Sequence, residues 1–134
     1  MKKALLPAGW VKPRGYANGV AAVGTQVFIA GQIGWDAEAR FHTTDFGQQA
    51  IQALRNVVAV LHEAGGQPEH LVRLTWYVTD KREYLAALKD IGRAFRELIG
   101  DYDIAMSAVQ VVALIEDEAK VEIEATAVIP HEVR

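Results

Sequence analysis

The sequence of 134 residues contains no cysteine and only four prolines. Without cysteine the chain can form no disulfide, no thiolate metal site and no cysteine nucleophile. No apolar run approaches the roughly 18 residues that a membrane-spanning helix needs. The beginning of the chain resembles a signal peptide, but its apolar run stops at Pro7. We therefore expect a cytoplasmic protein with no membrane partner.

A large excess of positive charge is also missing. Fourteen Lys and Arg residues face 17 Asp and Glu residues, so the net charge is −3. A protein that binds nucleic acid needs a basic stripe, and we expect no nucleic-acid partner. The hydrophobic share of 51% is too high for a disordered chain. The length suits a single domain of about 100–200 residues, which we expect to span residues 1–134.

Two amphipathic helices are predicted. The first begins at Asp45, whose carboxylate can cap the free amides, with Gln48 in the capping-box position. Apolar residues then recur every three or four positions until Gly65 ends the helix. The second repeats this pattern: Asp80 is the cap, Glu83 completes the box, and an apolar stripe runs to position 98.

The remaining segments read as strands. Residues 72–79 and 121–129 alternate between apolar and polar side chains, and residues 105–114 are almost wholly apolar, which favours a buried strand. Residues 16–23 and 26–32 are predicted to form a hairpin around Gly24-Thr25. The order β-β-(short β)-α-β-α-β-β predicts an α+β two-layer sandwich, with one mixed sheet covered on one face by two helices.

The opposite face of this sheet needs a cover. If the apolar residues of the alternating strands meet the helices, the other face carries these polar residues: Arg73, Thr75, Tyr77, Glu122, Glu124 and Thr126. It also carries one set of side chains from the apolar strand, such as Met106, Ala108 and Val112. A second copy of the chain is the expected cover. A monomer remains possible if the sheet curls into a closed barrel.

Common catalytic signatures are absent. The sequence has no phosphate-binding or dinucleotide-binding glycine loop and no H-E-x-x-H motif. The four histidines are widely separated, so we expect no metal site. Ser107 is the single serine and lacks a nucleophile elbow, so it is interpreted as a small strand residue.

Glu122 and Glu124 lie two positions apart on one strand, so both project from the same face. A solvated strand face would explain them. If this face meets a neighbour, however, a partly dry carboxylate has a raised proton affinity and can move a proton or hold a water. Glu122 is therefore a candidate acid and base.

One ordered set of short motifs runs over roughly residues 14–129: Gly15-Tyr16, Ala30-Gly31-Gln32, Gln48, Asn56, Ala64-Gly65, the run from Arg73 to Val78, Asp80, and the run from Val121 to Ala125. With this set the chain resembles the RidA/YjgF family of enamine and imine deaminases. The resemblance implies a homotrimer whose sheets face inward, with three clefts between subunits and no cofactor.

The resemblance also implies site residues. Glu122 falls on the glutamate that orients the attacking water, Tyr16 on the family tyrosine and Gly31 on a glycine of the cleft. Met106, followed by Ser107, stands where family deaminases carry the arginine that grips the substrate carboxylate. A thioether has no charge and no donor.

The substrate-binding set implied by the resemblance is Tyr16, Ala30, Gly31, Met106 and Ser107. Ala30 replaces a serine that is usual in the family. The chain therefore resembles a branch without the arginine, to which activity on 2-iminobutyrate does not transfer, unless Arg14 or Arg73 takes over.

Three functions follow from the resemblance. The first is hydrolytic deamination of a small enamine or imine other than 2-iminobutyrate, with Glu122 as the catalytic residue. The second is a non-catalytic trimer that binds a small molecule in a pocket made apolar by Met106. The third, an endoribonuclease, is disfavoured by the acidic net charge and by the lack of a basic and aromatic cluster.

Overall fold

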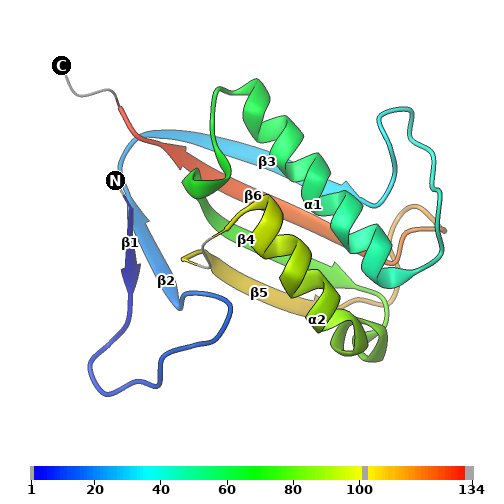
Figure 1. The fold of residues 1–134 in the computed structure, drawn as a ribbon, viewed down its shortest axis with the longest axis horizontal. Coiled ribbons are helices and arrows are strands. Elements are labelled where there is room, and N and C mark those ends of the chain that lie inside the picture. Colours follow the sequence, from blue (N-terminus) through cyan, green and yellow to red (C-terminus); the bar gives the residue numbers. More distant parts are fainter. Residues whose placement is uncertain (1, 101–102, 132–134) are drawn as a thin grey trace.

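The computed structural model describes residues 2–100 and 103–131. The helices α1 (Phe46–Glu63) and α2 (Lys81–Leu98) lie side by side on one face of a four-stranded sheet (Figure 1). The other elements are β1 (Lys2–Leu5), β2 (Gly19–Ala22), β3 (Thr25–Ile33), a 3-10 turn η1 (Pro68–His70), β4 (Leu71–Val78), β5 (Ala105–Gln110) and β6 (Val121–Ile129). The predicted α+β architecture of two layers is confirmed.

The main sheet has the strand order β3-β6-β4-β5. The pairs β3–β6 and β6–β4 are antiparallel, whereas β4 and β5 run parallel, so the sheet is mixed. The strands β1 and β2 form a separate antiparallel pair. A bridge between Ala17 and Ala105 links the approach to β2 with the edge strand β5, and the Ala17 N–H donates to the Ile104 carbonyl at 2.9 Å.

Both helices begin at the predicted aspartates. The Asp45 carboxylate accepts from the Gln48 N–H, and the Asp80 carboxylate accepts from two first-turn amides. In a capping box the side chain at the third helical position also accepts from the N–H of the cap residue. In both helices other contacts replace this second hydrogen bond. The Asp45 N–H donates to Thr43 Oγ1, and the Glu83 carboxylate binds Lys120 Nζ at 2.9 Å. A charged partner outside the helix holds Glu83 more strongly than a neutral amide does.

The predicted hairpin of residues 16–23 and 26–32 is wrong. The strand β2 pairs with β1, which the sequence did not indicate as a strand, and β3 pairs with β6. The corner at Gly24 explains the difference, because it carries the chain from the small sheet into the main one (Figure 1). Gly24 has φ +156°, and a Cβ there would overlap the Ile129 carbonyl oxygen. The corner therefore brings β3 against β6 instead of β2.

The predicted buried strand of residues 105–114 is also wrong in part. The strand β5 ends at Gln110, and its residues from Ser107 onward are exposed. It occupies an edge of the sheet, where one flank has no strand to cover it. Met106, expected on the uncovered face, pairs with Leu74 and packs against the core on the helix side.

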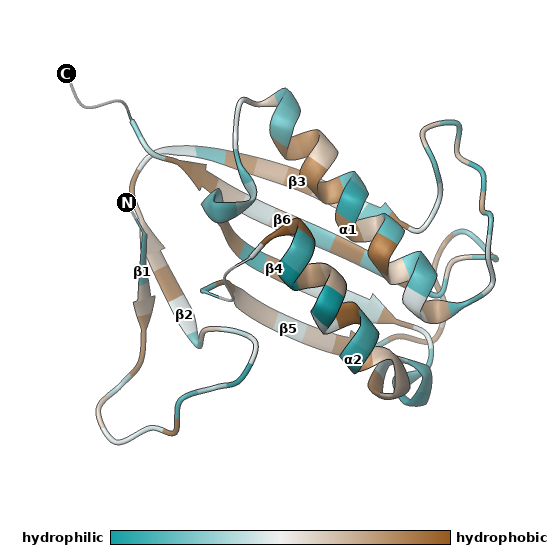
Figure 2. Cartoon of the chain, viewed as in Figure 1, coloured by the Kyte–Doolittle hydropathy of each residue, from teal (hydrophilic) through white to brown (hydrophobic). Residues whose placement is uncertain are grey.

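The core lies between the helices and one face of the sheet. Leu74, Trp76 and Val78 of β4 and Val121 and Ile123 of β6 belong to it. Figure 2 shows the matching pattern on the helices, whose outward sides are largely hydrophilic. The two helices contribute unequally: eight residues of α1 are buried, but only two of α2.

The opposite side of the sheet is here called the helix-free face. The alternation predicted for it is confirmed by the register, which aligns the polar residues of β4 and β6 across the two strands: Arg73 with Thr126, Thr75 with Glu124, and Tyr77 with Glu122. Phe28 of β3 pairs with Thr126 and is 75% exposed. In the part of the chain that is described, no helix is both long and apolar enough to cross a bilayer.

Gln49 ties α1 to the segment before β6. Its fully buried side chain donates to the carbonyls of Thr43 and Glu118 and accepts from the Lys120 N–H, at 2.8–3.0 Å. The variant Gln49→Leu leaves these buried backbone groups without partners. We expect the free energy of unfolding to fall by about 2–4 kcal/mol, measured by urea denaturation.

The matched control is Gln48→Leu, at the exposed neighbouring position. A surface substitution of this kind changes stability by no more than about 0.5 kcal/mol. Equal losses in the two variants would show that the three hydrogen bonds do not stabilise this junction.

Candidate functional site

Glu122 lies half-buried on the helix-free face, directly against Gly31. A Cβ added to Gly31 would overlap the Glu122 carboxylate, so only glycine leaves room for it. The register of β3 against β6 shifts between Ile29 and Gln32, which places Ala30 and Gly31 at an irregularity of the strand. Such irregularities redirect side chains near functional sites. The fold thus places Glu122, Gly31 and Ala30 together.

The two glutamates of β6 have different surroundings. Glu124 accepts a hydrogen bond of 2.6 Å from the Tyr77 hydroxyl. This bond, more than any other cause, raises the pKa of Tyr77, because loss of the proton would place a phenolate against a carboxylate. Among the described residues, no side chain or amide forms a hydrogen bond with the Glu122 carboxylate. Its carboxylate is available for water or a substrate, whereas that of Glu124 is engaged.

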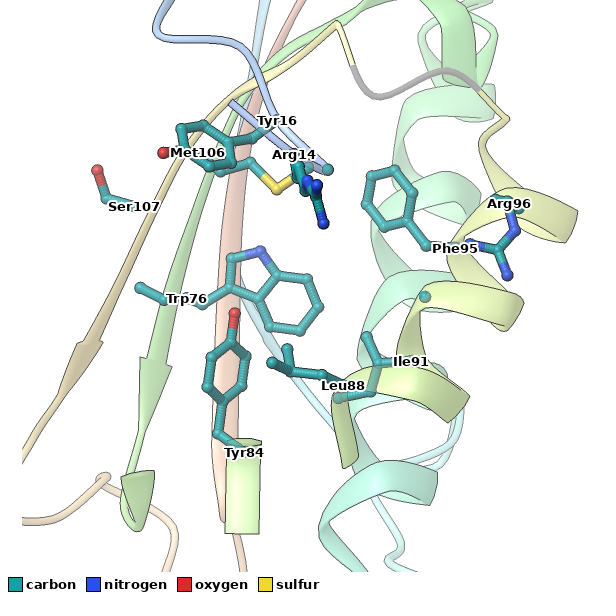
Figure 3. A pocket seen from close by; sticks show the side chains of 13 residues that line it. Arg14, Tyr16, Trp76, Tyr84, Leu88, Ile91, Phe95, Arg96, Met106 and Ser107 are labelled. Atoms are coloured by element: carbon teal, nitrogen blue, oxygen red, sulfur yellow. The ribbon is translucent and has the colours of Figure 1, made fainter. Parts of the chain in front are cut away.

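The second group of predicted residues lies in a pocket of about 650 Å³, here called the α2 pocket. It is bounded by α2, by β4 and β5, and by the loop of residues 14–16 (Figure 3). Tyr16 and Met106 line it, and the Met106 thioether points inward. Ser107 is at its border, with the hydroxyl directed away from the other side chains.

The α2 pocket exists because α2 packs loosely on the edge of the sheet. In α2, only the side chains of Ile91 and Phe95 are buried. Leu88 of the same helix is 43% exposed and lines the pocket. The strand beneath this part of α2 is β5, the edge strand, whose exposed side chains leave the space unfilled.

The predicted site residues therefore fall into two groups on opposite sides of the sheet. Glu122 and Gly31 share the helix-free face, whereas Tyr16 and Met106 line the α2 pocket on the helix side. Within one chain the sheet separates the two groups. A site that uses both can form only between chains.

Sequence reasoning missed one polar group of the α2 pocket. Trp76 of β4 is 3% exposed, and its indole Nε1–H has no hydrogen-bond partner among the described residues. The alternation of β4 indicated an apolar, helix-facing position for this residue, which is correct for the ring. No sequence signal showed that its N–H would remain unpaired, because that depends on what packs above it.

The pocket lining combines two arginines with apolar side chains and with the hydroxyl-bearing Tyr16, Tyr84 and Ser107. The arginines are Arg14, which is exposed, and Arg96, and none of the described lining residues is acidic. Burial raises the pKa of Tyr84, so its hydroxyl stays neutral. Within residues 2–100 and 103–131, no three His, Asp or Glu side chains gather as metal ligands would.

Known proteins with similar sequences show which family the chain belongs to. The family model described as endoribonuclease L-PSP matches residues 11–129. A Salmonella typhimurium protein named 2-iminobutanoate/2-iminopropanoate deaminase is 34% identical over 113 residues, which cover 84% of this chain and 86% of that protein.

Two solved structures share the fold. The structure of YyfB, a protein of the conserved Rid family from Yersinia pestis, has a TM-score of 0.82 at 30% identity and covers 96% of this chain and 98% of its own. The structure of Escherichia coli TdcF with bound serine has a TM-score of 0.71 at 31% identity, with coverage of 90% and 91%.

The contact between Gly31 and Glu122 can be tested against a second crowded glycine. In Gly31→Ala the three atoms nearest the new methyl all belong to the flexible Glu122 side chain, so we expect the carboxylate to move aside and the free energy of unfolding to change by less than about 1 kcal/mol. In Gly34→Ala the methyl comes within 2.6 Å of the Gln49 Cα, which is backbone. We expect that variant to lose about 1–3 kcal/mol.

Urea denaturation of both variants, with a crystal structure of Gly31→Ala, checks this expectation. A Glu122 side chain left in place beside the new methyl group, or a loss of stability as large as that of Gly34→Ala, would contradict it.

Proposed function

The chain belongs to the RidA/YjgF family, and on this premise we propose that it hydrolyses a small enamine or imine to a carbonyl compound and ammonia, without a cofactor, in clefts between the subunits of a homotrimer. The observation that carries the proposal is the Glu122 carboxylate, half-buried against Gly31 and without a hydrogen-bond partner among the described residues.

The reaction needs one group that first gives and then takes a proton. Protonated Glu122 delivers its proton to the carbon of an enamine, which becomes an iminium. Water then adds to the iminium carbon while the Glu122 carboxylate accepts a proton from it. The carbon–nitrogen bond breaks and ammonia leaves, which produces the carbonyl compound. A single positioned carboxyl group can serve both steps.

The split between the two groups of residues supports clefts between chains. Glu122 lies on the helix-free face and the α2 pocket opens on the other side of the same sheet. A second copy that docks on the helix-free face would bring its own α2 pocket toward Glu122. Apolar side chains exposed on that face, such as Phe28 and Val109, favour burial by another copy.

The residue at position 106 limits which substrate the site can bind. Met106 offers neither charge nor donor to a carboxylate, so the substrate differs from 2-iminobutanoate, which is named for the Salmonella relative. The apolar α2 pocket also favours a second candidate, a trimer that binds a small molecule without catalysis. Endoribonuclease activity, named in the family model, is less favoured, because a net charge of −3 repels a phosphate backbone.

The assembly can be tested by light scattering. We expect a mass of about 44 kDa, three times the 14.7 kDa of one chain. Phe28→Asp places a charge on the helix-free face and should shift the mass toward that of one chain. Leu85→Asp, at an exposed residue of α2, is the matched control and should leave the mass unchanged. A wild-type mass near 14.7 kDa would refute the trimer and its clefts.

The role of Glu122 can be tested with Glu122→Gln. Glutamine keeps the size of the side chain but cannot exchange a proton at neutral pH, so we expect turnover of an accepted enamine to fall by about 10²–10⁴-fold. A panel of enamine and imine acids is assayed for ammonia release, with 2-iminobutanoate as the substrate expected to react poorly.

Glu124→Gln is the matched control on the same strand face. Its amide oxygen still accepts from the Tyr77 hydroxyl, so activity should stay near that of the wild type. Equal activity of wild type and Glu122→Gln would remove Glu122 from the mechanism.

A further inference from the structure

The α2 pocket contains a hydrogen-bond donor that no described residue of the chain accepts from. Trp76 is 3% exposed, and its Nε1–H has no partner among the described residues. In Figure 3 the nitrogen edge of the indole faces the side of the pocket where Met106 and Arg14 lie. Buried donors are almost always paired in folded proteins. An acceptor from outside the chain would satisfy this one.

The charges of the pocket indicate what kind of acceptor it is. The lining includes Arg14 and Arg96, and none of its described residues is acidic. The Arg14 guanidinium is directed toward the pocket from the loop of residues 14–16 (Figure 3). An anion that accepts from the Trp76 N–H would lie near a positive charge. A carboxylate meets both conditions, because it can accept several hydrogen bonds at once.

The apolar side chains of the pocket indicate what the rest of the ligand, beyond its carboxylate, is like. Leu88, Ile91 and Phe95 of α2 face β4 and β5 across the cavity, whose volume is about 650 Å³. This volume lies within the range of about 300–1,000 Å³ of pockets that hold drug-sized molecules. The unbranched thioether of Met106 adapts to aromatic rings and contacts them favourably. A four-carbon acid would leave most of this apolar surface without a contact.

We infer that the α2 pocket binds carboxylic acids with an aromatic or similarly large apolar body, with the carboxylate held by the Trp76 N–H and Arg14. The inference rests on the proposed function and narrows it: the substrates are enamine or imine acids with such a side chain. Trp76 and Arg14 then determine specificity, at a site where Met106 supplies apolar surface and no charge.

Binding is tested by calorimetry with phenylpyruvate, a stable 2-oxo acid with an aromatic ring, and with pyruvate, which lacks the ring. We expect phenylpyruvate to bind at least about tenfold more tightly, equivalent to about 1.4 kcal/mol. Equal affinities, or no binding of phenylpyruvate at millimolar concentration, would overturn the inference.

The matched pair Trp76→Phe and Trp35→Phe isolates the indole N–H. Phenylalanine keeps an apolar ring at position 76 but removes the donor, so phenylpyruvate should bind about tenfold more weakly. Trp35 packs on Phe41 with ring centroids 5.8 Å apart and does not line the pocket, so its variant should bind as the wild type does. Arg14→Gln should also weaken binding, whereas Arg40→Gln, at an exposed residue outside the pocket, should not.

A spectroscopic measurement on the wild-type protein keeps the test independent of how the variants fold. The chain has three tryptophans, hence three indole N–H signals in a proton–nitrogen correlation spectrum. Phenylpyruvate should shift the Trp76 signal and leave that of Trp35 in place. An unmoved Trp76 signal under saturating phenylpyruvate would overturn the inference.

Failure of this inference and failure of the proposed function give different results. Binding without ammonia release from any imine would refute the enzyme and keep the pocket assignment. Ammonia release from small imines, without a response to phenylpyruvate, would refute the pocket assignment alone.

Discussion

Two helices cover one face of a four-stranded sheet and leave the other face without a cover, and most features of this protein depend on that asymmetry. The strands β4 and β6 alternate so that their apolar side chains meet α1 and α2 while polar side chains gather on the helix-free face. The surroundings of a residue on this face depend on whatever covers the face as well as on its own chain. Glu122, Glu124 and Tyr77 all lie there.

Hydrogen bonding separates the two glutamates of this face. Tyr77 engages the Glu124 carboxylate at 2.6 Å, whereas the Glu122 carboxylate lies against Gly31, where any side chain would displace it. Proton transfer needs a carboxylate that water or substrate can reach. The arrangement favours Glu122 as the reactive position on the grounds of its surroundings, in agreement with the resemblance to the RidA/YjgF family.

The helix side has an asymmetry of its own. The helix α1 buries eight residues and is tied to the segment before β6 through Gln49, while α2 buries two and lies over an edge strand. The looser contact leaves the α2 pocket, which is lined by Met106 and by the Trp76 N–H, for which the described part of the chain offers no acceptor. The Met106 thioether and the Trp76 N–H together give this space an apolar lining with a buried hydrogen-bond donor.

Local patterns determined the elements with caps and clear periodicity. Asp45 and Asp80 mark the starts of the helices, and the alternation of β4 and β6 indicates which side chains face inward, because these features depend on neighbours within a few residues. Family motifs added Glu122, Gly31, Tyr16 and Met106 as candidates. None of these signals showed that the sheet divides the candidates into two groups.

Contacts between distant segments decided the rest. The pairing of β3 with β6 instead of β2 depends on the approach of Gly24 to Ile129, and the exposure of β5 depends on its place at the edge of the sheet. The surroundings of the Trp76 N–H, in which no described residue accepts from it, likewise depend on how α2, β5 and the loop of residues 14–16 meet. The local sequence pattern indicates which face of an element a side chain lies on. Its contacts and hydrogen-bond partners are determined only by how remote segments pack around it.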